Sequence, residues 1–154
     1  MEKTTINSKF NIWVPIQTRF CDTDLMGHIN NVSYIAYLET ARVAYMEKLR
    51  EVSLKSNILA PFSFILAEIR CTYKSQGFFG EKLEVGLKIR EIRKKSFIYE
   101  YVIIEKGSGR IIVEAESVQV MYDYFNRKSM EIPDEFVIVA EQLEGRKIDR
   151  RTDI

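Results

Sequence analysis

Residues 19–34 decide the fold, and they read RFCDTDLMGHINNVSY. Residues 21–28 are rich in turn formers and poor in periodicity, so we interpret them as a loop. Asn30 or Asn31 then suits the N-cap of a helix, because a short side-chain oxygen can accept a hydrogen bond from an otherwise free amide of the first turn. A helical pattern of apolar residues follows, from residue 32 to about residue 49. The stretch therefore predicts a loop that leads directly into a long helix.

Strand patterns occupy most of the remaining chain. Before the loop, apolar and polar residues alternate within residues 10–20, as in a half-buried strand. Beyond the helix, which the polar residues 50–57 are expected to close, strands are expected over residues 64–74, 82–93, 97–105 and 111–124, and a last helix over residues 132–143. Short turns separate these four strands and favour antiparallel neighbours. The sequence thus predicts an α+β fold with one antiparallel sheet and one long helix.

Length and composition fit a single domain over residues 1–154. Apolar residues make up 46% of the chain, enough for a substantial core, and the formal net charge is only +1. A nucleic-acid binder usually carries a strong basic excess, so no nucleic-acid partner is expected. No apolar run reaches the roughly 18 residues of a membrane span, and residues 1–9 lack the apolar core of a signal peptide. We therefore expect a cytoplasmic protein with no membrane span.

Thiol and imidazole side chains are sparse. Cys21 and Cys71 stand apart without a C-x-x-C spacing, whereas a structural zinc site needs about four such ligands. A disulfide between the two stays open, although reduced thiols are usual in the cytosol. His28 is the one histidine of the chain, which excludes any mechanism that needs two. No metal and no cofactor are expected.

Residues 19–34, with the helix residues up to Arg42 that follow them, resemble the signature of the 4-hydroxybenzoyl-CoA thioesterase-like hotdog family. The motif is also similar to that of plant acyl-ACP thioesterases and bacterial long-chain acyl-CoA thioesterases, in the spacing Asp24-x-x-x-His28-x-Asn30-Asn31-x-x-Tyr34. This resemblance implies a hotdog fold, an antiparallel sheet wrapped around one long central helix. It also implies hydrolysis of acyl-CoA at the interface of a homodimer, which often pairs again into a homotetramer.

In the resembling family the position of Asp24 holds the catalytic carboxylate, which either attacks the thioester carbonyl or activates water for that attack. The residues themselves agree, because a carboxylate just before a helix start can lie beside the positive end of the helix dipole. Free amides at the helix start can receive the developing oxyanion, and Asn31 is the better candidate for this donor. The resemblance places His28 near the site, where it would orient substrate or water. The alternative for Asp22 and Asp24 is a turn-forming role, which we expect for Asp22.

Five more residues are expected to contact the substrate: Asn30, Tyr34, Lys94, Lys95 and Ser96. For Asn30 the alternative is a cap, and for Tyr34 it is packing. Ser96 aligns roughly with a region where relatives place a polar group that faces the thioester across the interface. Lys94 and Lys95 belong to a basic turn that is either simply solvated or holds the phosphates of CoA.

Two further interpretations stay open. An acyl-ACP thioesterase would use the same chemistry but dock an acidic carrier protein, and a net charge of +1 gives no sign of a large basic docking surface. A non-catalytic hotdog module that binds acyl-CoA would carry an additional DNA-binding segment, and only residues 1–9 precede the first expected strand. We therefore favour an acyl-CoA thioesterase. The abundance of Phe, Tyr and Ile fits aliphatic and aromatic acyl groups equally.

Overall fold

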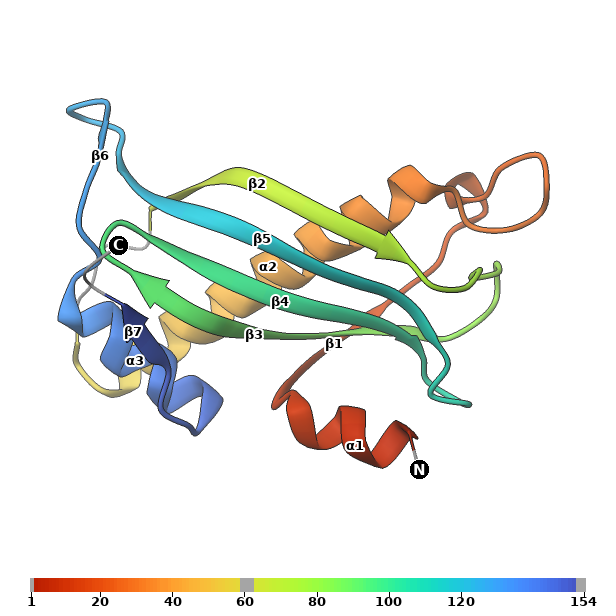
Figure 1. Cartoon of the computed structure of the whole chain (residues 1–154), viewed down its shortest axis with the longest axis horizontal. Helices are drawn as coiled ribbons and strands as arrows, with labels where there is room; N and C mark the ends of the chain where they lie inside the picture. Colours follow the sequence, from red (N-terminus) through yellow and green to blue (C-terminus); the bar gives the residue numbers. More distant parts are fainter. Residues whose placement is uncertain (1, 59–62, 152–154) are drawn as a thin grey trace. The chain divides into compact units, whose positions relative to one another are not determined.

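The computed structural model describes residues 2–58 and 63–151 (Figure 1). Its helices and strands follow in the order α1 (Glu2–Lys9), β1 (Ile12–Ile16), the 3₁₀ helix η1 (Phe20–Asp22), α2 (Asn31–Lys55), β2 (Phe64–Tyr73), β3 (Leu83–Arg93), β4 (Ser96–Glu105), β5 (Ile111–Asp123), β6 (Lys128–Ser129), α3 (Asp134–Glu144) and β7 (Asp149–Arg151). The predicted long helix is α2, and the predicted loop lies directly before it. The α+β class is therefore confirmed.

The strands of the described residues join in one sheet. Five of them follow the order β1-β3-β4-β5-β2, while β6 pairs with β5 and β7 pairs with β3. β1 runs antiparallel to β3, with Ile12 opposite Leu87 and Ile16 opposite Leu83. The predicted alternation of β3 places its apolar residues in the core, where Val85, Leu87 and Ile89 are fully buried.

One expectation about neighbours is wrong. The sequence predicts that the strands over 64–74 and 82–93 lie side by side, but β2 pairs with β5, and β3 lies between β1 and β4. The connection over residues 74–82 makes this possible. Neighbouring strands lie about 4.8 Å apart, so reaching β3 from beyond β5 spans about 15 Å. Nine extended residues span roughly 30 Å, so this segment is long enough to cross two strands.

Helix boundaries also differ from the prediction. α2 continues to Lys55 rather than ending near Leu49, because the polar run contains strong helix formers and still buries Ser53. Neither α1 nor β7 is predicted from the sequence. Residues 2–9 show no apolar period, and all three residues of β7 are exposed. The last helix agrees with the prediction, since α3 follows Pro133 and ends before Gly145, whose φ of +67° suits a left-handed C-cap.

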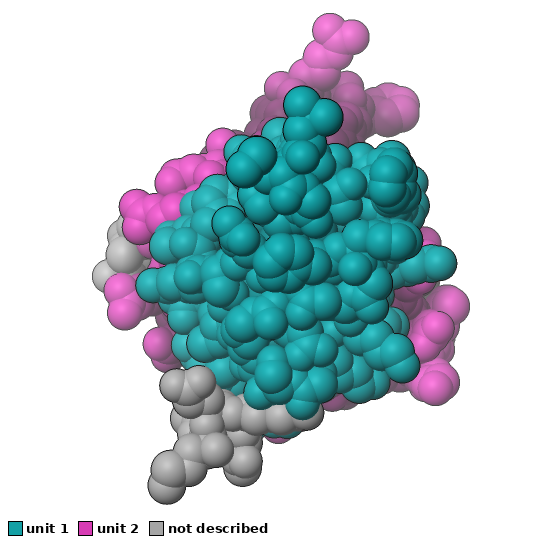
Figure 2. Space-filling model, turned by 90° about the vertical axis from the view of Figure 1, so that its right-hand side faces the viewer, with its two compact units in different colours: residues 1–44, 71–88, 101–115 teal, residues 45–70, 89–100, 116–154 magenta. Residues whose placement is uncertain are grey.

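The chain divides into two compact units, drawn in teal and magenta in Figure 2. Unit 1 comprises residues 1–44, 71–88 and 101–115, and unit 2 comprises residues 45–70, 89–100 and 116–154. In unit 1, Phe10 packs with Val102 and Ile104, and the ring of Trp13 meets Phe10 edge-on at 5.9 Å. The loop before α2 belongs to this unit.

Aromatic rings form much of the core of unit 2. The ring of Phe97 contacts those of Phe64, Tyr99 and Phe136 at 4.8, 4.8 and 5.3 Å between centroids. Tyr45 of α2 meets Tyr99 at 5.1 Å. All of these pairs except the tilted Phe97–Phe136 are edge-to-face, and such pairs stabilise a core beyond the area they bury.

Candidate active site

A tight turn in the loop before α2 brings Asp24 and His28 together. The amide of Asp24 donates to the carbonyl of His28 at 3.0 Å, and the amide of Gly27 donates back to the carbonyl of Asp24 at 3.2 Å. Gly27 has a φ of +85°, a conformation that glycine adopts without the clash of a Cβ. The geometry of this turn places Oδ2 of Asp24 at 3.5 Å from Nδ1 of His28.

Both side chains of this pair are partly open to solvent. The Asp24 side chain is 31% exposed and that of His28 is 26% exposed. Oδ1 of Asp24 accepts a hydrogen bond from the amide of Met26 at 2.8 Å, so the predicted turn-forming role is also present. One carboxylate oxygen is thus used by the turn, and the other faces the imidazole.

Asp22 has a very different environment. It is buried, and its carboxylate accepts hydrogen bonds from the hydroxyl of Tyr37 at 2.7 Å, the amide of Arg19 at 2.9 Å and the guanidinium of Arg19 at 3.2 Å. Burial by itself raises the pKa of Asp22, but the hydrogen bonds from Tyr37 and Arg19 outweigh it, so the pKa lies below its ordinary value. Asp22 therefore fixes the loop to α2.

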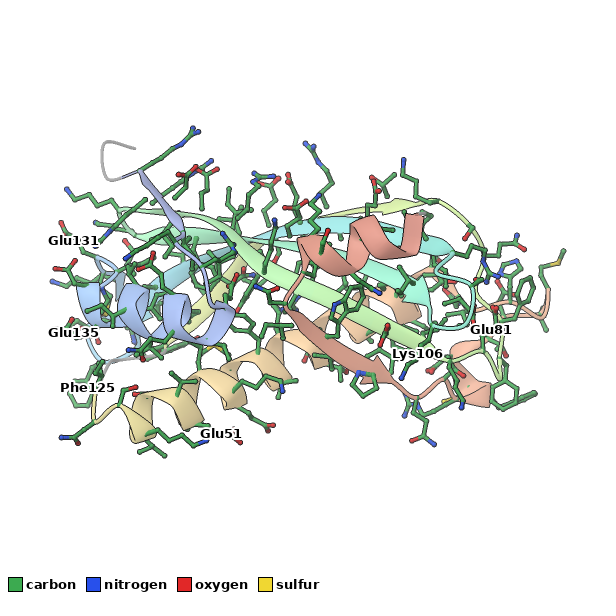
Figure 3. The ribbon with its side chains drawn as sticks, turned by 90° about the horizontal axis from the view of Figure 1, so that it is seen from below. Glu51, Glu81, Lys106, Phe125, Glu131 and Glu135 are labelled. Carbon is green, nitrogen blue, oxygen red and sulfur yellow. The ribbon has the colours of Figure 1, made fainter. Side chains whose placement is uncertain are left out.

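A second segment, residues 75–81, supports the loop from the other side. The amide of Ile29 donates to the carbonyl of Gly77 at 2.8 Å, and His28 forms an antiparallel bridge with Phe78. Glu81, labelled in Figure 3, accepts from the amide of Phe78 at 2.8 Å and pairs with Arg110 at 2.8 Å. The ion pair with Arg110 thus helps to fix the segment that forms the bridge with His28.

Sequence reasoning misses this support. The glycines at 77 and 80 predict only a break between strands, and Glu81 and Arg110 carry no local signal because they lie far apart in the chain. The sequence feature that could indicate this support is Gly77. A Cβ on Gly77 would lie 2.9 Å from the hydroxyl of Tyr34, so the close approach requires glycine.

Asn30 is the residue that caps α2. Its side-chain oxygen accepts from the amide of Val32 at 3.0 Å, and its carbonyl accepts from the amide of Ser33 at 3.0 Å. Asn31 is the first residue of the helix, and its carbonyl accepts from the hydroxyl of Tyr73 at 3.1 Å. Within the described residues, the backbone amide of Asn31 donates to no partner. That amide is therefore available to a ligand at this helix start.

Tyr34 is buried rather than open to a ligand. Its hydroxyl accepts from the amide of Gly77 at 2.8 Å, and its ring lies 6.0 Å from that of Tyr37 and 5.8 Å from that of Tyr73. Burial raises the pKa of Tyr34. The packing alternative therefore describes its contacts in this structure.

The predicted site residues fall into two groups. Asp24, His28, Asn30, Asn31 and Tyr34 lie together in unit 1. The other three belong to unit 2, where Ser96 starts β4 and is half-buried, and Lys94 and Lys95 are exposed. The ammonium of Lys94 lies 3.4 Å from a carboxylate oxygen of Glu131. In the described part of the chain, no three or more His, Cys, Asp and Glu side chains gather as a metal site.

The sequence and the fold of this chain are similar to those of known proteins. A sequence model of the thioesterase-like superfamily matches residues 18–143. The chain belongs to the thioesterase-like superfamily. The match includes the loop, α2 and most of the sheet, and it confirms the thioesterase family indicated by the sequence motif. Along residues 2–58 and 63–151, no helix has the length and apolar character needed to cross a membrane.

Individual relatives of this thioesterase-like chain are distant. It is similar to the uncharacterized protein YsmA of Bacillus subtilis, with 27% identity over 62% of this chain and 62% of that protein. It is 23% identical to the long-chain acyl-CoA thioesterase FadM of Escherichia coli over 83% of this chain and 96% of that protein. These relatives support the assignment of this chain as a thioesterase enzyme.

Solved structures agree on the architecture. A thioesterase from Thermus thermophilus, crystallised with coenzyme A and zinc, superimposes with a TM-score of 0.76 at 23% identity, covering 89% of this chain and 96% of that one. This likeness confirms the hotdog fold.

Proposed function

We propose that this thioesterase hydrolyses acyl-CoA to the free acid and CoA, with Asp24 as the reacting carboxylate. The main support for the role of Asp24 is the contrast between the two aspartates of the loop. Asp22 is buried and accepts hydrogen bonds from Tyr37 and Arg19, whereas Asp24 keeps Oδ2 beside His28 in a partly open position. The names of FadM and of the Thermus structure support a CoA thioester as the substrate.

Two routes are open to the Asp24 carboxylate. As a general base, it takes a proton from water while the water oxygen attacks the thioester carbonyl carbon, and the departing CoA thiolate then receives that proton. As a nucleophile, it attacks the carbonyl carbon itself, expels the thiolate and forms an anhydride that water hydrolyses. In either route the amide of Asn31 is the proposed donor to the oxyanion, and His28 orients substrate or water.

The remaining predicted site residues complete the proposal. Asn30 and Tyr34 position the helix start that faces the acyl group, while Ser96 of a second copy contributes a polar group that faces the thioester across the dimer interface. Lys94 and Lys95 are exposed cations suited to the phosphates of CoA. One domain over residues 1–154 is proposed, and the family match across both units supports it.

We further propose a homodimer or homotetramer. β2 is the last strand in the main path of the sheet, and its Leu66 and Tyr73 side chains are exposed. An exposed edge strand with apolar side chains offers a template for a strand of a second copy. Light scattering on the eluted protein tests this, and a monomer at micromolar concentration would rule it out.

The catalytic proposal is tested with Asp24→Asn, which keeps the size of the side chain and removes its charge. Wild type and variant are assayed on acyl-CoAs from acetyl to palmitoyl and on benzoyl-CoA, by release of the CoA thiol. The expected loss is about 100-fold or more. The matched control is Asp149→Asn, which changes an exposed aspartate of β7 and should leave the rate unchanged.

Other results of these assays would contradict the proposal or distinguish the two routes. A folded Asp24→Asn variant with wild-type activity would show that Asp24 only forms the turn. A wild type that hydrolyses no acyl-CoA would favour an acyl-ACP thioesterase or a non-catalytic acyl-CoA-binding module. In an active enzyme, a single turnover in ¹⁸O-labelled water labels Asp24 only if the carboxylate acts as a nucleophile and water opens the anhydride at the aspartyl carbonyl, whereas a general base places the label in the product acid alone.

A further inference from the structure

The turn between β5 and β6, residues 123–128, displays two aromatic side chains to solvent. We call it the hairpin tip. Tyr124 is 62% exposed and Phe125 is 98% exposed. Figure 1 shows the hairpin tip extending past the turn between β3 and β4, and Figure 3 labels Phe125 at this end of unit 2. Single exposed apolar residues are common, but an aromatic ring displayed almost completely at a projecting turn favours a binding role.

The hairpin tip is held in one conformation by its own hydrogen bonds. The carboxylate of Asp123 accepts from the amide of Phe125 at 2.9 Å, and from the amide and side chain of Asn126 at 3.1 and 2.7 Å. Asp123 lies opposite Lys128 in the antiparallel register of β5 and β6, and the ring of Tyr124 meets that of Tyr122 edge-on at 5.1 Å. The turn therefore presents Phe125 outward instead of letting it fold back onto the sheet.

Positive charge surrounds this aromatic residue. Arg127 and Lys128 follow it in the turn, and both are exposed. The adjoining turn between β3 and β4 adds Lys94 and Lys95, whose carbonyls accept from the amides of Ile132 and Met121, both at 2.9 Å. The carboxylate of Asp123 is used by the turn, and that of Glu131 pairs with Lys94. The hairpin tip thus combines a projecting aromatic ring with a basic flank.

We propose that the hairpin tip docks on an anionic lipid surface, with Phe125 at the level of the headgroups and Arg127 and Lys128 on lipid phosphates. A projecting tip buries little area against a rigid protein surface, whereas a lipid interface deforms around it. Aromatic rings favour the boundary between headgroups and acyl chains, and basic side chains are attracted by anionic lipids. This inference does not depend on the role of Asp24.

The test is sedimentation of the full chain with vesicles. Wild type should sediment with an equimolar mixture of phosphatidylglycerol and phosphatidylcholine, and much less with phosphatidylcholine alone. Phe125→Ser should weaken this binding roughly tenfold, as expected for loss of one inserted aromatic ring. Raising NaCl from about 50 to about 500 mM should also weaken it, since salt screens the attraction.

Control variants distinguish vesicle binding by the hairpin tip from nonspecific adsorption. Leu54→Ser removes another exposed apolar side chain of unit 2 and should bind vesicles like wild type. Arg127→Ser should lower binding to the anionic vesicles while leaving the thermal unfolding midpoint unchanged. Lys94 and Lys95 are left intact, so the test does not touch the residues proposed for CoA phosphates. The proposal would be overturned if wild type did not bind anionic vesicles, or if Phe125→Ser bound them like wild type. Binding of the hairpin tip to an acidic carrier protein only would also overturn it.

Discussion

The hydroxyl of Tyr37 donates a hydrogen bond to Oδ2 of Asp22 at 2.7 Å, and both side chains are buried. This bond joins the loop before α2 to the inner face of that helix. It also separates two aspartates that stand only two positions apart in the sequence. Asp22 is used by the fold, whereas Oδ2 of Asp24 lies beside His28 in a partly open position.

Tyr37→Phe should therefore destabilise the protein without removing a reacting group. The substitution leaves a buried carboxylate short of one donor, which costs about 1 to 3 kcal/mol. Urea unfolding at pH 7 measures the change. The matched control is Tyr73→Phe, because the Tyr73 hydroxyl makes an exposed bond to Asn31 and its loss should cost less than about 1 kcal/mol.

The same substitution should alter the pH dependence of stability. The pKa of Asp22 is lowered in the folded protein, so folding releases protons in the window below its ordinary value of 3.8. Its contribution is complete above that value and is lost as the pH falls through the lowered pKa. The stability difference between wild type and Tyr37→Phe should thus be constant above about pH 4 and shrink as the pH falls below it. A difference that stays constant would mean that Asp22 does not titrate with this bond.

The sequence predicts the local parts of this site and misses the distant ones. The turn at Gly27 and the cap at Asn30 follow from residues within a few positions, so both can be inferred from spacing. The support from Gly77 and Arg110 depends on β2 lying beside β5, a pairing that has no signature in either strand. Long-range strand order is set by burial over the whole sheet, so its prediction needs more than alternation.

Gly77→Ala should disturb the site from outside the motif. The added Cβ would lie 2.9 Å from the hydroxyl of Tyr34 and 3.2 Å from Cδ1 of Ile29. Overpacking of this kind costs about 1 to 3 kcal/mol. Removing the hydroxyl by Tyr34→Phe in the same chain should recover part of the loss, and a double-mutant cycle by urea unfolding measures the coupling. Strictly additive losses would show that the two side chains do not meet.

Asn30 can be tested as a cap against its proposed role in binding substrate. Asn30→Ala removes the acceptor for the amide of Val32 and should cost about 1 kcal/mol. Asn30→Ser keeps a capping oxygen and should recover the stability. If the cap is what matters for hydrolysis, Asn30→Ser should also recover the rate on acyl-CoA. A stable Asn30→Ser variant with a raised KM would instead show a direct contact between the amide side chain and the substrate.

Glu144 should give the opposite dependence on pH from Asp22. Its buried carboxylate accepts from the hydroxyl of Tyr45 at 2.5 Å and the amide of Ile89 at 3.0 Å, and it lies 3.0 Å from the guanidinium of Arg146. Burial raises the pKa of Glu144, although these partners oppose the rise. The folded state therefore holds a proton more firmly than the unfolded state, and the contribution of Glu144 to stability falls as the pH rises through the window above 4.5.

Glu144→Gln removes this titration and should destabilise the protein by about 1 to 3 kcal/mol, because an amide group then faces Arg146. The stability difference from wild type should narrow as the pH rises through the window above 4.5, measured by urea unfolding. Glu135→Gln, on the exposed face of α3, is the control and should show neither effect. A difference that widens with pH would mean that the bonds from Tyr45, Ile89 and Arg146 outweigh burial, so that the carboxylate is stabilised in its charged form.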